Sequence, residues 1–351
     1  MSRLVVVSNR VPVPGRGPAA GGLAPAVSSA LRESGGLWFG WSGQIVQDSI
    51  KPTDIREVDR ITYATVDLSE KSHKGFYEGY ANQTLWPLFH NRLDLAVFDR
   101  SVFDRYTAVN EFFADRLVPL LQDEDLVWVH DYHLIPLGEE LRRRGCNPRI
   151  GFFLHTPFPA PEILTTLFNH KRLVRSLFAY DLIGFQTHTD VRSFSNYVVQ
   201  ELRGGLAHKY GDLSAYGETT RAGVYPISID PDAFKALAAS PSARRYREQV
   251  KASLAGRSLI LSVDRLDYTK GLPERLAAVE QLFERFPEHC NCVTFMQIAS
   301  PSRSNVPQYK HIRRKLEGAV GRINGRFRFD CFSNSRRLAK ESAWSVNRLI
   351  N

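Results

Sequence analysis

Short apolar runs alternate along the chain with longer segments in which apolar residues recur every three or four positions. The short runs are rich in Val, Ile and Leu, as strands buried on both faces are, and the longer segments have the period of amphipathic helices. This alternation predicts an α/β protein built on parallel sheets. The predicted strands cover residues 4–8, 37–41, 62–66, 126–130, 149–155, 182–185, 224–227, 258–263 and 291–298. The predicted helices cover residues 24–32, 106–121, 161–167, 190–202, 243–255, 271–286 and 306–316.

Two domains are expected, because a chain of 351 residues is long for a single core. A segment with several prolines and small residues, 226–242, suggests the boundary. We therefore predict domains over residues 1–235 and 236–330, followed by a tail over 331–351 that has no clear apolar period. The Gly-rich and polar stretch 204–220 is predicted to be a loop.

Composition excludes several classes of protein. The net charge of +9 is scattered along the chain without a nucleic-acid-binding signature, so we expect no nucleic-acid partner. No run approaches the roughly 18 apolar residues that span a membrane, and the N-terminus does not have a secretory pattern. The four cysteines fit neither a disulfide framework nor a zinc site. These features predict a cytoplasmic protein with no membrane partner.

The strongest candidate chemistry lies in residues 258–275. A buried strand leads into a short loop that contains Arg265 and Lys270, and a helix begins at Gly271. Open α/β sheets bind anions in such a loop, between the carboxyl end of a strand and a helix N-terminus. A planar Arg fork beside a mobile Lys charge suits a diphosphate. An isolated Arg and Lys at this spacing would more often form a solvated basic loop, but this context favours an anion site.

Two further groups of residues are candidates for ligand binding in the N-terminal half. Arg10 closes the first strand, and Gly21 and Gly22 open the next helix, where bare backbone can approach an oxygen anion. A glycine doublet would also suit a plain turn. Tyr77 and Trp86 each offer an apolar face and one donor, which suits a sugar ring.

Polar residues also follow three other strands. Asp131 comes after strand 126–130, His155 ends strand 149–155, and Arg303 lies in a Ser/Pro loop after strand 291–298. Buried Asp and His side chains at such positions need partners, which either a structural network or a ligand could supply. Strand ends at the carboxyl edge of a sheet favour the ligand at least equally.

From Met1 to about Phe327, these motifs in this order resemble the trehalose-6-phosphate synthases. The resemblance implies a GT-B glycosyltransferase, in which two Rossmann-like doubly wound domains face a cleft. The first domain would bind the acceptor and the second, incomplete one would bind the nucleotide sugar. The implied reaction transfers glucose from UDP-glucose to glucose-6-phosphate with retention and yields α,α-trehalose-6-phosphate and UDP, in trehalose biosynthesis.

The same resemblance implies roles for single residues. Contacts with glucose-6-phosphate are implied for Arg10, Tyr77, Trp86, Asp131 and Arg303. Contacts with UDP-glucose are implied for Gly21, Gly22, Arg265 and Lys270, and catalytic roles for Arg265, Lys270 and His155. The implied route is a front-face transfer in which the leaving phosphate takes the acceptor's proton, without a metal or cofactor. A homo-oligomer is compatible with the sequence.

The chain departs from the family pattern after Phe327. The family continues with a strand and with a loop that holds the donor's phosphates and ribose, whereas residues 328–351 contain neither. A frameshift or a truncated copy is the simplest interpretation, and it predicts weak or absent turnover. Two alternatives stay open: an inactive paralogue that binds only glucose-6-phosphate, and a related GT-B transferase that uses a different nucleotide donor.

Overall fold

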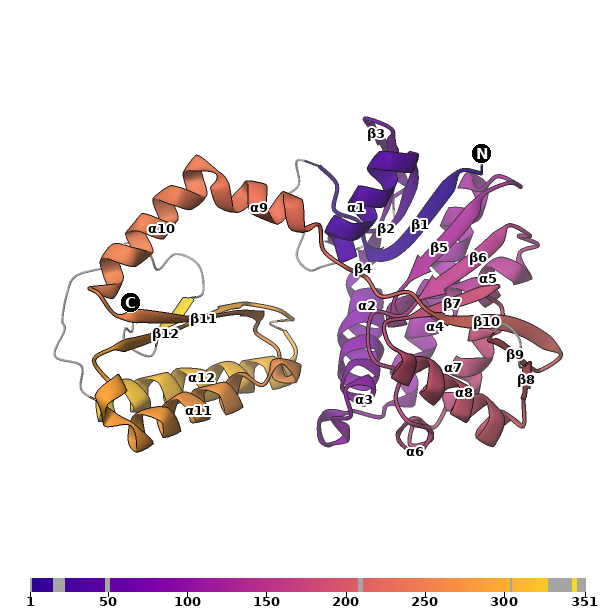
Figure 1. Ribbon diagram of the computed structural model, residues 1–351. Helices are drawn as coiled ribbons and strands as arrows, with labels where there is room; N and C mark the ends of the chain where they lie inside the picture. The colour runs from indigo at the N-terminus through magenta and orange to yellow at the C-terminus, as the bar shows by residue number, and fades with distance from the viewer. Residues whose placement is uncertain are drawn as a thin grey trace. The chain divides into compact units, whose positions relative to one another are not determined.

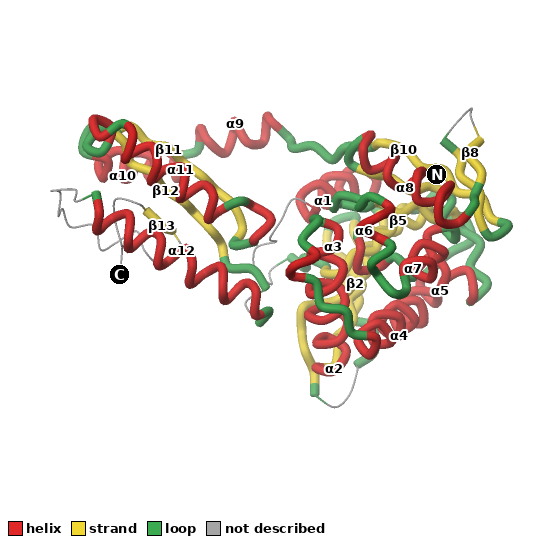
Figure 2. The backbone as a smooth tube through the Cα atoms, turned by 90° about the horizontal axis from the view of Figure 1, so that it is seen from below, coloured by secondary structure: helices red, strands yellow, loops and turns green. Residues whose placement is uncertain are grey.

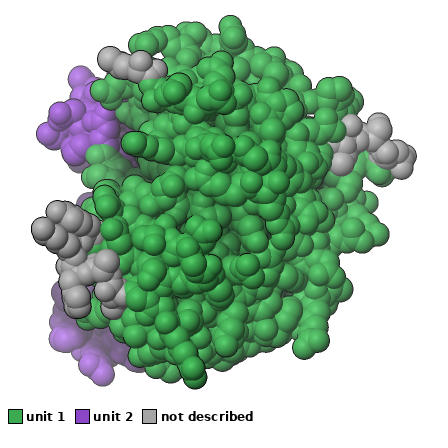
Figure 3. All heavy atoms as spheres, turned by 90° about the vertical axis from the view of Figure 1, so that its right-hand side faces the viewer, with its two compact units in different colours: residues 1–229 green, residues 230–351 purple. Residues whose placement is uncertain are grey.

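The computed structural model describes residues 2–14, 23–47, 51–207, 211–303, 305–327 and 343–345. The chain divides into two compact units, residues 1–229 and 230–351, which Figure 3 colours separately. The second unit begins where Asp230 caps helix α9 (Pro231–Ala239) by accepting hydrogen bonds from the backbone of Asp232 and Ala233. The boundary expected at residue 235 lies within this helix.

Unit 1 is built on one ten-stranded sheet with the order β3-β4-β2-β1-β5-β6-β7-β10-β9-β8. Its parallel strands are β1 (Leu4–Arg10), β2 (Gly36–Val46), β4 (Ile61–Ser69), β5 (Leu126–His130), β6 (Arg149–Phe153), β7 (Leu182–Phe185) and β10 (Glu218–Val224). Its antiparallel strands are β3 (Asp54–Val58), β8 (Gly205–Ala207) and β9 (Asp212–Ala215). The central strands are apolar along their length because neighbouring strands and helices bury them, and Val5 to Val7 are fully buried.

Helices cover this sheet on both sides (Figure 1), with α1 on one side and α3, α4 and α7 on the other. The α-helices are α1 (Leu23–Ser34), α2 (Glu70–His73), α3 (Trp86–Phe89), α4 (Arg100–Leu117), α5 (Leu137–Arg143), α6 (Pro161–Leu164), α7 (His170–Leu177) and α8 (His188–Leu202). A π-helix, η1 (Lys74–Leu85), joins α2 to α3, and 3-10 turns form η2 (Leu93–Leu95), η3 (Val118–Leu120) and η4 (Tyr132–Leu134).

Two predictions in unit 1 are wrong. The strand expected over 224–227 ends at Val224, and the loop expected over 204–220 contains β8, β9 and the start of β10. Tyr216 and Gly217, with φ of 59° and 82°, form the tight turn between β9 and β10. Positive φ at both central positions matches the twist of a hairpin. The polar residues 212–220 therefore fold into strands at the edge of the sheet.

Unit 2 contains a small sheet with helices on one face. Strands β11 (Ser258–Arg265) and β12 (Val293–Ser300) are parallel, and β13 (Ala343–Ser345) pairs with β12 in the antiparallel sense. Helices α11 (Leu272–Arg285) and α12 (Pro307–Arg326) lie side by side along the sheet (Figure 2) and form the core with it. The remaining elements are α9, α10 (Pro241–Leu254), η5 (Tyr268–Lys270) and η6 (Pro287–His289).

One strand of unit 2 exposes apolar side chains. Ile260, Leu261 and Val263 on β11 are 43%, 54% and 61% exposed, although the strand has the composition of a buried one. Within the described residues β11 is also an edge strand. No helix in the described ranges is both long enough and apolar enough to cross a membrane.

Candidate functional site

The sheet of unit 1 reverses its direction of growth at β1. The chain passes from β1 to β2 on one side, and later places β5 on the other side of β1. Ligands of open α/β sheets bind outside the carboxyl ends of the strands at such a point. Arg10 ends β1, Asp131 directly follows β5, and His155 follows β6. The fold thus brings these three predicted residues to one edge of the sheet.

Arg10 lies over an aromatic ring at this edge. Its guanidinium carbon is 5.9 Å from the centroid of Trp41, near the end of the parallel pairing of β1 with β2. Gly43 makes room for the guanidinium, since a Cβ there would lie 2.9 Å from Nε of Arg10, and its φ of +89° also favours glycine. The segment 38–43 is rich in Trp and Gly, a composition that suits core packing and a ligand site equally well. Trp38 is such a core residue, whereas Trp41 supports the candidate site.

Tyr77 lies in the π-helix η1 and joins an aromatic cluster beside Trp41. The ring centroids of Tyr77 and Trp41 are 6.0 Å apart, and the ring of Tyr77 stacks on that of His133 at 5.8 Å with an interplanar angle of 13°. His73 completes the cluster at 5.2 Å from Tyr77. The apolar pattern of the sequence predicts no helix here, because a π-helix does not follow the usual apolar period.

Trp86 begins α3, one helical segment further along, and is 6% exposed. Its ring packs against His90 at 4.1 Å and Tyr132 at 5.7 Å. Asn82 ties the two aromatic positions together, since its amide donates to the backbone oxygen of Tyr77 at 2.7 Å and its Oδ1 accepts from Tyr132 at 3.0 Å. The π-helix therefore places Tyr77 and Trp86 in one connected framework.

Asp131 has a strained backbone at the end of β5. Its φ of 76° lies in a region that residues other than glycine rarely adopt, at a cost of about 1–3 kcal/mol. Its backbone N–H donates to Phe153 at 2.8 Å, and its Oδ1 accepts from the backbone N–H of His155 at 3.2 Å. His133 lies 4.0 Å from the other carboxylate oxygen. These contacts fix the direction of the carboxylate, as a binding site requires.

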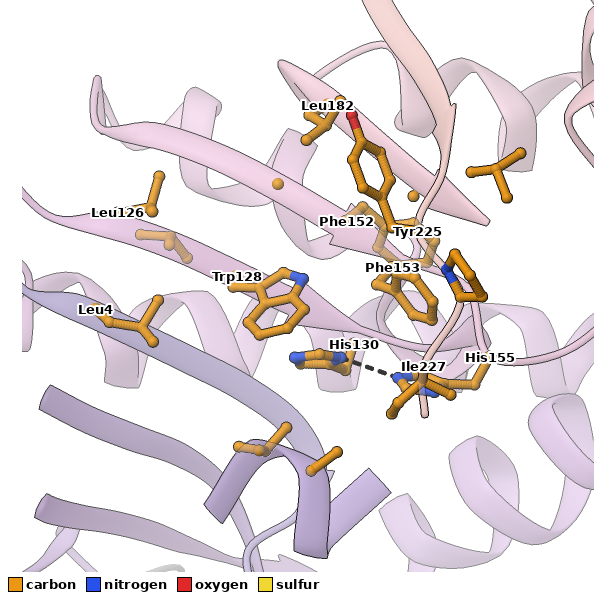
Figure 4. A pocket seen from close by; sticks show the side chains of 17 residues that line it. Leu4, Leu126, Trp128, His130, Phe152, Phe153, His155, Leu182, Tyr225 and Ile227 are labelled. Atoms are coloured by element: carbon orange, nitrogen blue, oxygen red, sulfur yellow. Dashed lines mark hydrogen bonds between the residues drawn. The ribbon is translucent and has the colours of Figure 1, made fainter. Parts of the chain in front are cut away.

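His130 contacts the ring of His155 directly (Figure 4), with 3.0 Å between Nδ1 of His130 and Nε2 of His155. Burial lowers the pKa of His130 well below its usual value, and the neighbouring His155 lowers it further. Burial also lowers the pKa of His155, while the charge of Asp131 opposes this shift. Both rings are therefore neutral near pH 7. His130 is not among the residues predicted from the sequence, although its place at the end of an apolar strand was a usable signal.

An apolar cavity of about 660 Å³ lies beside this pair of histidines, on the face of the unit 1 sheet that also carries α1. Its walls include Trp128, Phe153, Tyr225 and Ile227, and the two histidines line it as well. The cavity places an apolar environment behind His130, which is 1% exposed.

In unit 2, the predicted cations lie at the carboxyl end of the parallel pair. Arg265 is the last residue of β11 and pairs in register with Ser300, the last residue of β12. Lys270 ends η5 and is exposed, and Gly271 caps α11 with a φ of +61°, a conformation that favours glycine. The predicted order of strand, cations and helix N-terminus is present, but Arg265 belongs to the strand and not to the loop, because β11 extends two residues beyond the predicted end at 263.

Arg303 reaches the same end of unit 2 from β12. Its side chain is 6% exposed, and Nη1 donates to Oδ2 of Asp267 at 2.9 Å and to the hydroxyl of Tyr309 at 2.6 Å. Asp267 is fully buried. Arg303 is thus oriented by the buried carboxylate of Asp267, a residue that is not among those predicted from the sequence.

Gly21 and Gly22, the two glycines predicted to contact the donor, lie outside the described residues. Among the residues that are described, no group of three or more His, Cys, Asp or Glu side chains is arranged to hold a metal ion.

Comparison with known proteins identifies the family. The model of glycosyltransferase family 20 matches residues 5–333. The chain belongs to this family. A trehalose-6-phosphate synthase of Enterobacter sp. (strain 638) is 46% identical over 328 residues, which cover 93% of this chain and 69% of the relative.

Solved structures agree with this family. An α,α-trehalose-phosphate synthase (UDP-forming) from Burkholderia xenovorans, in complex with glucose-6-phosphate, matches with a TM-score of 0.89 and 46% identity over 94% of this chain and 72% of its own. A structure from E. coli bound with UDP-2-fluoro glucose matches with a TM-score of 0.88 and 45% identity over 94% of this chain and 71% of its own. These matches confirm the predicted family and the GT-B fold class.

Proposed function

We propose that the chain transfers glucose from UDP-glucose to glucose-6-phosphate, with retention, to give α,α-trehalose-6-phosphate and UDP. The observation that carries this proposal is the placement of Arg10, Asp131 and His155 after neighbouring strands at one edge of the unit 1 sheet, beside its switch point. Relatives at 45–46% identity support the substrates, since one was solved with glucose-6-phosphate and another with UDP-2-fluoro glucose.

Unit 1 would bind the acceptor. The guanidinium of Arg10 would bind the phosphate through two parallel hydrogen bonds. The ring of Trp41 and the absence of a Cβ at Gly43 orient this guanidinium. Tyr77 and Trp86 would supply apolar walls for the glucose ring, and Asp131 would accept hydrogen bonds from its hydroxyls. Arg303 of unit 2 would supply a second charge to the phosphate.

Unit 2 would bind the donor diphosphate through Arg265 and Lys270 at the N-terminus of α11. Negative charge grows on the departing UDP in the transition state, so these two cations would stabilise that state more than the bound substrate. The leaving phosphate would take the proton of the acceptor hydroxyl on the same face of the sugar. His155 would contact the donor sugar, as would the backbone of Gly21 and Gly22. The cytoplasmic location and a homo-oligomer remain predictions.

Phosphorus NMR of the 351-residue chain with both substrates tests the reaction. The proposal expects UDP and trehalose-6-phosphate to appear together, and only when both substrates are present. Lys270→Ala should slow their appearance at least about tenfold, since a charged hydrogen bond contributes about 1.5–3 kcal/mol. Lys251→Ala, on the exposed side of α10, is the matched control and should leave the rate unchanged.

A second candidate is a protein that binds glucose-6-phosphate without transferring glucose. The exposed apolar side chains of β11 favour it, because a donor-binding sheet is expected to be covered. Separate calorimetric titrations distinguish the two candidates. A transferase binds both UDP-glucose and glucose-6-phosphate, whereas the second candidate binds glucose-6-phosphate alone.

A further inference from the structure

His130, at the end of β5, and His155, just after β6, are joined by one hydrogen bond between their rings. The distance of 3.0 Å between Nδ1 of His130 and Nε2 of His155 is that of a hydrogen bond, so one nitrogen carries hydrogen and the other accepts it. Both rings are neutral near pH 7, because burial lowers both pKa values. Each ring therefore has one N–H, and the direction of this bond decides where the second proton lies.

Burial of His130 determines that direction. Its Nε2 is inaccessible to solvent and has no hydrogen-bond partner among the described residues. If His155 donated, the proton of His130 would have to sit on Nε2 as a buried donor without an acceptor. Unpaired buried N–H groups are rarer in proteins than under-used acceptors. The favoured arrangement leaves a lone pair on Nε2 and puts the proton of His130 on Nδ1.

We propose that His130 is a positioning residue, which donates from Nδ1 to Nε2 of His155 and so keeps His155 protonated on its own Nδ1. His155 is then a hydrogen-bond donor, suited to an oxygen atom of the donor sugar. This second part rests on the proposed function, whereas the tautomer does not. Asp131 fixes the backbone of His155 from the other side, through the bond between Oδ1 and the backbone N–H at 3.2 Å.

Nitrogen NMR of the chain labelled with ¹⁵N-histidine tests the tautomer without ligand or turnover. In the wild type, His155 should show a protonated Nδ1 and an unprotonated Nε2. His130→Asn keeps an amide N–H near the position of Nδ1 and should retain this pattern. His130→Leu removes the donor at similar volume and should give a mixture of tautomers. A protonated Nε2 on His155 in the wild type, or an unchanged tautomer in His130→Leu, would overturn the proposal.

His170→Asn is the matched control, because Nδ1 of His170 also makes a partly buried hydrogen bond, with the hydroxyl of Tyr197 at 2.5 Å. It should leave the signals of His155 unchanged. UDP-glucose titration then tests the consequence for binding. His130→Leu should weaken affinity up to about tenfold, the equivalent of one hydrogen bond, and His130→Asn should restore most of it.

The two parts can fail separately. A wild-type chain with the expected tautomer that does not bind UDP-glucose would contradict the proposed function while the positioning role stands. A chain with the expected tautomer that binds UDP-glucose equally well in the wild type and in His130→Leu would contradict the hydrogen bond from His155 to the donor sugar, while the tautomer stands.

Discussion

Asp267 and Arg303 form a buried ion pair in unit 2, with 2.9 Å between Oδ2 and Nη1. The second oxygen of the same carboxylate accepts from the backbone N–H and the hydroxyl of Thr269, at 3.1 and 3.0 Å. Thr269 belongs to η5, which ends at Lys270. One carboxylate therefore fixes both the loop that ends at Lys270 and the side chain of Arg303.

Asp267→Asn should strongly destabilise unit 2. The substitution leaves the charge of Arg303 buried without its partner, and breaking a buried pair costs about 3–5 kcal/mol. Hydrogen exchange of peptides from α11 and α12 should become markedly faster. The control is Asp232→Asn, whose ion pair with Lys235 is exposed at both side chains. Equal exchange rates in the two variants would contradict the role assigned to Asp267.

Gly43→Ala should weaken the binding of glucose-6-phosphate at least about tenfold. A Cβ at this position would lie 2.9 Å from Nε and Nη2 of Arg10 and would displace the guanidinium. Gly145→Ala provides a matched control, because its φ of +78° gives similar backbone strain with nothing within 4 Å of the new Cβ. Calorimetry should show a loss of affinity for Gly43→Ala alone. Similar affinities would mean that Arg10 does not bind the phosphate.

Acid should destabilise unit 1 through the two neutral histidines. Their folded pKa values lie below the unfolded value of about 6.5, so the unfolded chain binds more protons as pH falls. Their contribution is complete above about pH 6.5 and is lost below it, by up to about 1.4 kcal/mol per pH unit for each group. Urea unfolding of unit 1 at pH 7.5 and 5.5 measures this loss, which should be smaller in His130→Leu. An equal loss in both proteins would contradict this explanation.

Val263→Lys should increase solubility without loss of structure. Val263 is 61% exposed on β11, which is an edge strand among the described residues, and a Lys side chain on such a strand discourages pairing between chains. Sedimentation at increasing concentration should show less self-association than in the wild type. The buried Phe295 on the neighbouring β12 provides a contrast, since Phe295→Lys should unfold the unit. Unchanged self-association in Val263→Lys would mean that β11 is not the strand through which chains associate.

The sequence predicted the central strands of unit 1 well and the π-helix η1 poorly. The bounds of β5 and β7 match the prediction, because their apolar runs end at polar residues or turns. The sequence pattern did not predict the π-helix that carries Tyr77. Backbone hydrogen bonds in a π-helix span five residues, so its side chains follow no simple apolar period. The hairpin turn at residues 216–217 was missed because positive φ at a tyrosine is not visible in composition.

The site was predictable to the level of strand ends and no further. Placement of Arg10, Asp131 and His155 at one edge follows from parallel strands, since their carboxyl ends share an edge. The hydrogen bond between His130 and His155 depends on the rotamers of two side chains on neighbouring strands. The ion pair of Asp267 with Arg303 depends on the backbone of Arg303, which has a φ of +49°. Such contacts come from tertiary packing, which no local pattern encodes.

Titration of glucose-6-phosphate into the 351-residue chain and its Arg10→Ala variant tests whether unit 1 binds the acceptor phosphate through Arg10. We predict saturable binding in the wild type and a loss of affinity of at least about tenfold in Arg10→Ala, since a charged hydrogen bond contributes about 1.5–3 kcal/mol. Arg56→Ala removes an arginine from the exposed pair with Asp54 and should bind as the wild type does. Absence of binding in the wild type, or equal affinity in Arg10→Ala, would mean that Arg10 does not form an acceptor site in unit 1.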